Sequence, residues 1–364
     1  MQLRGLLPVA FAALAAAAEP LTAVLKANND TLSTFKELLA MAPEFSKVLA
    51  SSKDFTILAP SNDAFAKAMQ MDPTLVQKAT NVTFVTDLLS YHVVTGKTMD
   101  SMFSAKPRFV TTFYETPTAN VTGAQKVELV EKSDKAVVFS GFKQMSTIIQ
   151  SDISFSGGVL HVIDSVLTFP GTPFETAMNT GLTSMAGALM RAKMVNDIDS
   201  LQAATVFAPT NDAFQSVGGT VASMQPQDLA KILQYHVLTN QVRFSTGVTT
   251  KMAFKSLMGS KVTLRKEGEV FANSAKVTIG DIITSDGVMH VVDSVLNPEA
   301  PKLAPKTKTP AFDAAVAADR PPFADTVQPT ANFVLTTSAV ARSVNTRVSS
   351  AVLGFLVSAV ILVL

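Results

Sequence analysis

An internal repeat constrains this chain more than any other feature. Three stretches recur in the same order: residues 55–65 (FTILAPSNDAF) return as 205–214 (TVFAPTNDAF), 88–96 (LLSYHVVTG) as 232–240 (ILQYHVLTN), and 157–167 (GGVLHVIDSVL) as 286–296 (DGVMHVVDSVL). The second copy is shorter between these landmarks, which is how loops vary on a shared fold. The 364 residues are enough for two domains of ordinary size.

Each copy begins with helical periodicity and continues with strands. Apolar residues fall on one helical face in both copies: Leu32, Phe35, Leu38 and Leu39 in the first, and Leu182, Met185, Leu189 and Met190 in the second. The runs that end at Pro60 and Pro209 predict buried strands, and Ser61 and Thr210 then stand where helix N-caps belong. Alternating residues at 126–132 and 261–267 predict strands with one solvated face. The sequence therefore predicts an α+β unit, twice.

Both ends of the sequence resemble processing signals. Residues 1–18 combine a basic Arg4, an apolar stretch and small residues, which predicts a cleaved secretory signal peptide, with a short membrane anchor as the alternative. Residues 339–364 contain a polar spacer and a terminal apolar run, and small residues lie around Ser338. This order predicts lipid attachment at Ser338 through a glycosylphosphatidylinositol (GPI) anchor, with a tail-anchored helix as the alternative.

Composition and motifs exclude several classes of function. The chain is 47% hydrophobic and 16% charged, so it can bury sizeable cores, and its net charge of +1 without a basic cluster argues against nucleic acid. It has no cysteine, and therefore no disulfide and no cysteine-ligated metal. Motifs for a nucleophile elbow, a phosphate loop or a zinc helix are missing. We therefore expect no catalytic residue, no cofactor and no metal site.

All four histidines of the chain lie in the repeated stretches: His92, His161, His236 and His290. His92 and His236 continue an apolar helical stripe whose edge carries Tyr91 and Tyr235, which favours buried, hydrogen-bonded histidines. His161 stands three residues before an aspartate in a strand-like run, so the two side chains point to opposite faces and cannot form a catalytic pair there. We expect the four histidines to be structural.

In this order, TVFAPTNDAF, YHVL and GVMHVVDSVL resemble the fasciclin-like domain family. The resemblance implies two tandem domains, at 19–169 and 170–298, each a wedge-shaped β-sandwich with packed helices. It also implies a role in cell adhesion or matrix association on anchored surface proteins. A candidate surface contact follows from the resemblance, because some animal members of the family present the Tyr-His region to integrins; the matching residues here are Tyr91, His92, Tyr235 and His236.

The remaining sequence features are a proline-rich segment and three glycosylation sequons. The proline-rich residues 299–338 predict a semi-extended stalk. Three glycosylation sequons lie in the first copy, at Asn29, Asn81 and Asn120, and the second copy has none. If sugar covers the first domain, the bare second domain is the expected docking surface.

These observations predict a non-enzymatic, glycosylated adhesion protein at the cell surface, anchored by lipid to the plasma membrane or cell wall. Its expected partners are surface or matrix proteins, wall polysaccharide or a second copy of itself. The alternative is a secreted or vacuolar protein that binds or hydrolyses carbohydrate. An open pocket with paired carboxylates or an exposed aromatic platform would favour that alternative.

Overall fold

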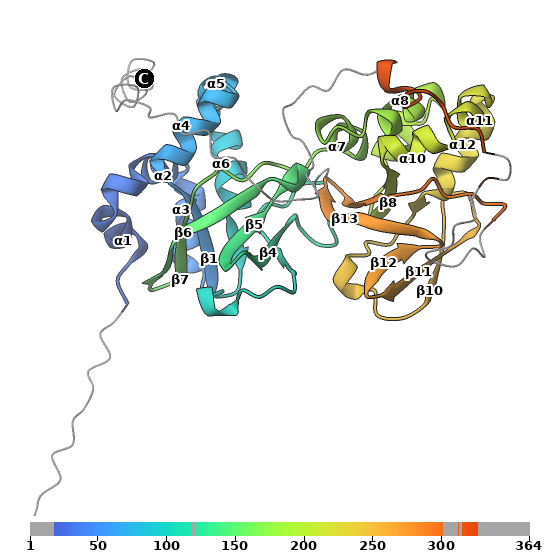
Figure 1. Cartoon of the computed structure of the whole chain (residues 1–364). Coiled ribbons are helices and arrows are strands. Elements are labelled where there is room, and N and C mark those ends of the chain that lie inside the picture. Colours follow the sequence, from blue (N-terminus) through green and yellow to red (C-terminus); the bar gives the residue numbers. More distant parts are fainter. Residues whose placement is uncertain (1–17, 118, 120, 301–311, 313–314, 327–364) are drawn as a thin grey trace, which may run out of the picture.

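The computed structural model of the chain describes residues 18–117, 119, 121–300, 312 and 315–326. Two domains lie side by side, each with a sheet covered by helices, which confirms the predicted tandem α+β architecture (Figure 1). The helices of the first domain are α1 (Leu21–Ala27), α2 (Asn29–Met41), α3 (Pro43–Ser51), α4 (Asn62–Met71), α5 (Thr74–Lys78) and α6 (Val82–Tyr91). Its strands are β1 (Phe55–Pro60), β2 (Val93–Thr95), β3 (Arg108–Thr111), β4 (Lys126–Lys132), β5 (Lys135–Phe139), β6 (Met145–Phe155) and β7 (Gly158–Ile163).

The second domain repeats this order of elements. Its helices are α7 (Pro173–Asn179), α8 (Thr183–Arg191), α9 (Val195–Asp199), α10 (Asn211–Ser216), α11 (Gly218–Ser223) and α12 (Pro226–Tyr235). Its strands are β8 (Ala204–Pro209), β9 (Val237–Leu238), β10 (Met252–Lys255), β11 (Lys261–Glu267), β12 (Glu269–Ala272), β13 (Ala275–Thr284) and β14 (Gly287–Val292). Short 3₁₀ turns lie at η1 (Asp100–Met102), η2 (Gly141–Lys143), η3 (Ser245–Gly247) and η4 (Ala324–Thr326).

Each domain has one seven-stranded sheet that bends back on itself. The strand order is β2-β1-β7-β6-β5-β4-β3 in the first domain and β10-β11-β12-β13-β14-β8-β9 in the second. An isolated bridge between Val94 and Thr112, and another between Leu238 and Ser256, brings the two ends of each sheet together. The sheet is therefore nearly closed and barrel-like, and its two walls form the two layers of the sandwich that the resemblance implies.

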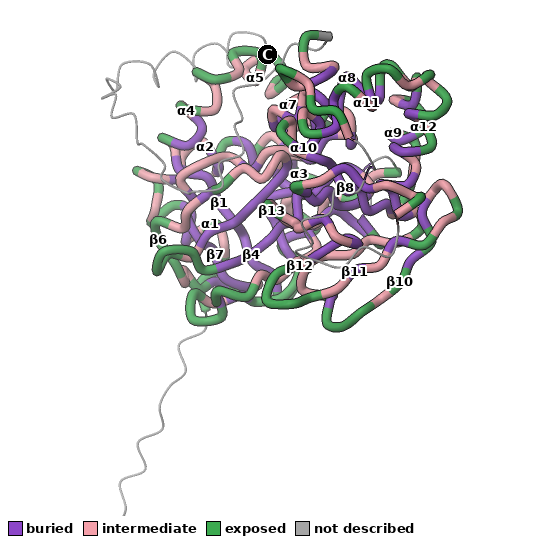
Figure 2. Tube along the Cα trace, turned by 45° about the vertical axis from the view of Figure 1, so that its right-hand side comes forward, coloured by how far each residue is buried: buried purple, intermediate pink, exposed green. Residues whose placement is uncertain are grey.

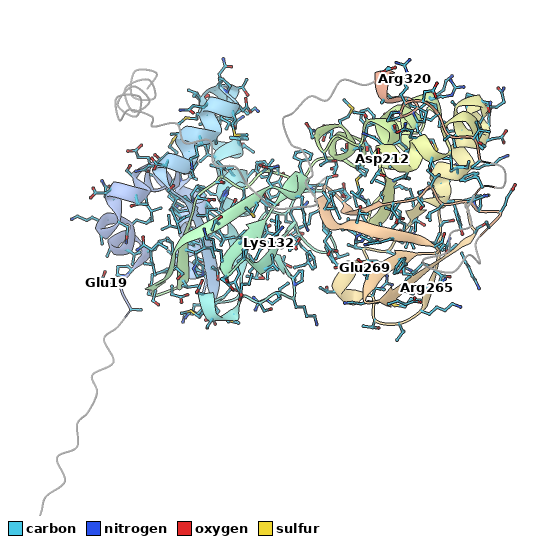
Figure 3. All side chains as sticks on the ribbon, viewed as in Figure 1. Glu19, Lys132, Asp212, Arg265, Glu269 and Arg320 are labelled. Atoms are coloured by element: carbon cyan, nitrogen blue, oxygen red, sulfur yellow. The ribbon has the colours of Figure 1, made fainter. Side chains whose placement is uncertain are left out.

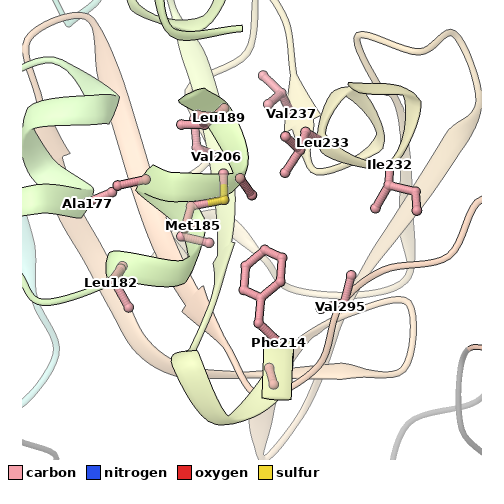
Figure 4. Close-up of a cluster of buried hydrophobic side chains, with 14 of the residues drawn as sticks. Ala177, Leu182, Met185, Leu189, Val206, Phe214, Ile232, Leu233, Val237 and Val295 are labelled. Carbon is pink, nitrogen blue, oxygen red and sulfur yellow. The ribbon is translucent and has the colours of Figure 1, made fainter. Parts of the chain in front are cut away.

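The centre of each sheet is a parallel pair of strands, β1 with β7 and β8 with β14. Every residue of these four strands is buried, and they run through the interior of both domains (Figure 2). One apolar core fills the bent sheet and another lies between sheet and helices. In the second domain, Leu182, Met185 and Leu189 belong with Phe214 of α10 to the core between sheet and helices (Figure 4).

Most of the predicted helical faces are confirmed, but two details are wrong. Met190 is 47% exposed, because it lies one position beyond the stripe that α8 buries. The strand at 126–132 lacks a solvated face near its start, since Glu128 is only 3% exposed. The second domain packs against this strand and takes the place of solvent. The equivalent strand β11 does alternate, as expected.

Polar and aromatic contacts join the two domains. The side-chain amide of Gln125 donates to the carbonyl oxygens of Thr284 and Ser285, at 3.3 and 3.0 Å. The rings of Phe109 and Phe244 stack with their centroids 3.8 Å apart. A hydrogen bond of 2.8 Å from the Ser285 amide to the Gly171 carbonyl ties the linker to the same place.

A buried ion pair lies in this interface. The Lys143 ammonium contacts the Glu128 carboxylate and donates to the Asp281 carbonyl oxygen at 3.2 Å. Burial raises the pKa of Glu128, and the neighbouring Lys143 opposes that rise. The lysine therefore has partners in both domains, and removing it would leave a buried carboxylate without its counter-charge.

Part of the segment expected to be a stalk packs on the second domain instead. We call Phe312 together with residues 315–326 the strap. Phe312 is 6% exposed and belongs to the core between helices and sheet. The Gly219 amide donates to the Val316 carbonyl at 2.8 Å, and the Ala318 amide to the Gln215 carbonyl at 2.9 Å. These residues therefore pack on the helical side of the second domain.

The end of the strap is anchored by an aromatic ring. The Phe323 ring meets the Phe214 ring edge-on at 6.4 Å, and the Arg191 guanidinium lies 5.9 Å from its centre. Phe323 has a φ of 65°, a conformation that a bulky residue keeps only where its surroundings hold it. Arg320, in the same segment, lies on the helical side of the domain (Figure 3) and pairs with Asp325 at 2.9 Å.

The strap should therefore stabilise the second domain. We expect Phe312→Ala to lower the free energy of unfolding of this domain by about 3 kcal/mol, because it removes a buried ring from the core. Hydrogen–deuterium exchange of β8 and β14 measures the loss, and β1 and β7 report on the first domain. Val316→Ala, at a side chain that is 60% exposed, is the matched control and should change exchange little. Unchanged exchange in Phe312→Ala would show that the strap only rests on the surface.

Candidate functional site

His92 and His236 end the helices α6 and α12 as their C-cap residues. The Nδ1 atom of His92 donates to the Leu88 carbonyl at 2.7 Å, and its Nε2 atom accepts from the Leu167 amide at 2.9 Å. His236 repeats both bonds at 2.8 Å, with Ile232 and Leu296. Each ring therefore joins the end of a helix to the chain that follows the last strand of its sheet.

His161 and His290 lie at the centre of β7 and β14 and also bond to backbone through both nitrogens. Nδ1 accepts from an amide at 3.2 Å, and Nε2 donates to a carbonyl oxygen at 2.7 Å. The amide and carbonyl partners are Asp152 and Thr98 for His161, and Asp281 and Arg243 for His290. The carboxylate of Asp164, directly after the end of β7, instead accepts from the Thr147 amide at 2.8 Å.

These bonds require neutral imidazole rings. A protonated ring would turn its accepting nitrogen toward a backbone N–H as a second donor. Burial lowers the pKa of His92 and of His236 to about 4, and it also lowers the pKa of His290. The expectation that the histidines are buried fold residues is confirmed.

The candidate surface contact at the Tyr-His region does not fit this structure. Tyr91, Tyr235 and His236 are 0% exposed and His92 is 1% exposed. The Tyr235 hydroxyl donates to the Lys261 carbonyl at 2.9 Å, and the Tyr91 hydroxyl makes the equivalent but longer bond, 3.3 Å, to Lys126. The tyrosines are therefore not at the edge of the helical stripe but inside the bent sheet. A partner could reach these rings only by opening the domain.

Two of the three sequons fall on described residues, and both asparagines are exposed. Asn29 begins α2, and Asn81 is the N-cap of α6. The Asn81 side-chain oxygen accepts from the Thr83 and Phe84 amides at 2.8 and 3.3 Å. This cap uses the oxygen and leaves the nitrogen, the atom that carries a glycan. Asn120 and Ser338 lie outside the described residues.

A concave site lies in the first domain. A cavity of about 410 Å³ opens between α2, α4, α5 and α6. Its walls are mainly apolar, with Leu38, Met41, Phe65, Met69, Leu75, Val76, Phe84 and Leu88 among them. No sequence motif predicts this cavity, because its lining residues resemble ordinary core positions of four amphipathic helices.

The polar residues of the cavity lining are few, namely Ser33, Thr34, Glu37 and Asn62. The Asn62 side chain accepts from the Thr34 amide and donates to the Asp30 carbonyl, both at 3.0 Å, so it holds α4 against α2. Glu37 is the one carboxylate among the lining residues, and it is exposed. Glycoside hydrolysis uses a pair of carboxyl groups, which this lining does not supply. The cavity is suited to binding an apolar group.

Within the described parts of the chain, no three histidine or acidic residues gather into a possible metal site. Among the same residues, no helix is both long and apolar enough to cross a membrane. The described aromatic rings pack mainly against one another or against core residues.

Comparison with known proteins identifies both repeats. Residues 30–169 and 180–298 match the sequence model of the fasciclin domain. A fasciclin-like arabinogalactan protein of Arthroderma benhamiae is 33% identical over 273 residues, which cover 73% of this chain and 64% of that protein. The fasciclin-like arabinogalactan protein elcF of Phaeosphaeria nodorum is 28% identical over 278 residues, 75% of this chain and 86% of that protein. A solved FAS1 domain pair from the insect cell adhesion molecule Fasciclin I aligns with 18% identity and a TM-score of 0.36, over 74% and 98% of the two chains.

Two of the histidines, His92 and His236, make the free energy of unfolding depend on pH. The pKa of His236 falls from 6.5 in the unfolded chain to about 4 in the folded one. Its contribution to the free energy of unfolding is therefore complete above pH 6.5 and is lost as pH falls toward 4. Each such histidine should cost its domain about 2 kcal/mol between pH 7 and pH 5. Urea unfolding at both pH values measures this loss.

The matched variants are His236→Gln and His92→Gln. Both should be less stable than the parent at pH 7, because a buried backbone partner is left unsatisfied. Their further loss on going to pH 5 should be smaller by about 2 kcal/mol in the affected domain, since the titrating group is gone. An undiminished loss would mean that these rings do not titrate as the structure requires.

Proposed function

Because the chain belongs to the fasciclin domain family, we propose that it acts without catalysis, as an adhesion protein of the cell surface or cell wall. The observation that carries this proposal is the use of the histidines. All four have both ring nitrogens bonded to backbone atoms, so the groups best suited to proton transfer are committed to the fold.

The interface supports a role as a spacer with two binding modules. Gln125 and Lys143 of the first domain bond to carbonyl groups of the second, so the domains are held at a fixed separation. Two modules on one chain, and many chains on one surface, multiply weak contacts through their high effective concentration. The proposed partners are surface or matrix proteins, wall polysaccharide or a second copy of the chain.

The chain is proposed to reach the surface by the secretory route and to stay there through lipid. Residues 1–18 would direct secretion, and residues 339–364 would be exchanged for a GPI anchor at Ser338. Because the strap packs on the second domain as far as η4, only the residues between Thr326 and Ser338 would separate that domain from the membrane. Glycans at Asn29, Asn81 and Asn120 would cover parts of the first domain.

The anchor can be tested on intact cells. We expect phosphatidylinositol-specific phospholipase C to release the protein into the medium, because this enzyme cleaves the lipid of a GPI anchor. Deleting residues 351–364 should also send the protein to the medium, since the attachment signal loses its apolar tail. Immunoblots of cells and medium measure both. A protein that resists the enzyme and retains its C-terminal peptide by mass spectrometry has a tail anchor instead.

Adhesion should depend on density. Beads that carry the protein at increasing surface density should bind cell walls, matrix or one another more than proportionally, because several weak contacts must form together. Counting bound beads by microscopy measures the curve. Beads that carry the same amount of acid-unfolded protein are the control. Binding that is absent at every density, or equal for folded and unfolded protein, would contradict an adhesive role.

A further inference from the structure

The strap of the second domain covers the place where the first domain has its cavity. Corresponding positions follow from matched contacts, because the Asn62 side chain accepts from the Thr34 amide as the Asn211 side chain accepts from the Ser184 amide. This register pairs Phe65 with Phe214, Met41 with Arg191 and Met69 with Gly218. The first member of each pair lines the cavity. The second member contacts the strap.

From this correspondence we propose that the cavity of the first domain binds an extended peptide segment of a partner protein, anchored by a phenylalanine side chain. The second domain shows that this helical face accepts such a segment, because Phe323 of the strap lies against Phe214 there. The first domain presents the equivalent ring, Phe65, in an open cavity of about 410 Å³. The proposal does not depend on the adhesive role and can fail or succeed separately.

The substitutions between the two faces indicate which part of the strap the ligand resembles. A Cβ atom at Gly218 would lie 2.5 Å from the Ala318 Cβ, so a segment that follows the course of the strap cannot pass Met69. Gln215, whose amide bonds to the Ala318 and Asp319 carbonyls, is replaced by Ala66. A ligand in the first domain would therefore not resemble the first half of the strap. It would resemble only the second half, around Phe323, which we call the anchor half.

The walls of the cavity fit an aromatic anchor of variable shape. Met41 stands where the second domain has Arg191, so the phenylalanine ring of the ligand would meet a thioether instead of a guanidinium. Met69 adds a second thioether. Methionine side chains adapt to different apolar partners and contact aromatic rings favourably. Two of the helices that line the cavity also carry large exposed apolar side chains, Met71 (68% exposed) at the end of α4 and Val82 (54%) at the start of α6. Exposed apolar side chains of this size are typical of docking sites.

The probe for this site is the labelled peptide RPPFADT, which is the anchor half of the strap. The protein should carry Thr83→Ala, because this removes the Asn81 sequon at the start of α6 but keeps the backbone amide that Asn81 caps. We expect saturable binding by fluorescence anisotropy. The peptide RPPAADT, which lacks the ring, should bind about tenfold more weakly or worse.

Methionine methyl NMR locates the peptide. Met41 and Met69 line the cavity, whereas Met178 and Met224 pack in the second domain, so the first pair should shift on titration and the second should not. Shifts confined to Met178 and Met224 would show that the peptide displaces the strap, and they would overturn the proposal. Absence of any saturable shift would overturn it as well.

Filling the cavity should abolish binding. Ala68→Phe places a ring inside it, and we expect affinity to fall about tenfold or more. Val48→Phe adds the same ring to α3, outside the lining and at a side chain that is 47% exposed, and should leave affinity unchanged. Ala79→Glu, which places a charge at the lining from the end of α5, is a second variant in case Ala68→Phe unfolds the domain. Full affinity in a folded Ala68→Phe or Ala79→Glu protein would refute the site.

A lipid chain is the alternative occupant of an apolar cavity, and oleate is the probe that distinguishes lipid binding from peptide binding. If the site is for peptide, oleate should shift the Met41 and Met69 methyl signals less than RPPFADT does at equal concentration. RPPAADT should not compete with RPPFADT for the site. If oleate saturates the site while both peptides fail to displace it, the cavity holds lipid and the peptide proposal is wrong.

Discussion

Each domain depends on a buried parallel pair of strands that joins the first strand of a repeat to its last. The approach is close: a Cβ atom at Gly158 would lie 1.9 Å from the Phe55 carbonyl oxygen, and one at Gly287 would lie 2.0 Å from that of Ala204. The glycines are therefore required by the pairing itself. The helices before and after the first strand pack together against this pair of strands in one apolar core.

The histidines add cross-links to this frame. His161 lies inside the last strand and bonds to the Thr98 carbonyl, so it holds the loop after β2 against the sheet. His92 bonds to the Leu167 amide and holds the end of α6 to the chain beyond β7. A neutral imidazole has one donor and one acceptor on opposite sides of a rigid ring, so it can bridge two backbone segments that do not pair directly. This explains why the same residue type recurs at both positions of both repeats.

Duplication has produced two domains with one fold and different surfaces. The second domain covers its helical face with the strap, and glycine at positions 218 and 219 lets that segment approach the helix backbone. The first domain has Met69 and Gln70 at the corresponding places, and its helical face stays open. The bare second repeat is the docking surface that the sequons favour, yet the open apolar site is on the first.

The sequence by itself determined the repeat, the α+β class, the N-caps Ser61 and Thr210 and the structural use of the histidines, because these follow from local spacing and from residue chemistry. Only the tertiary structure decided that Glu128 is buried, since the domain that covers it is more than a hundred residues away along the chain. It also decided the course of the strap, whose prolines and alanines predict an extended spacer. The cavity also could not be predicted from the sequence, because an apolar helical face has the same pattern whether a neighbour covers it or not.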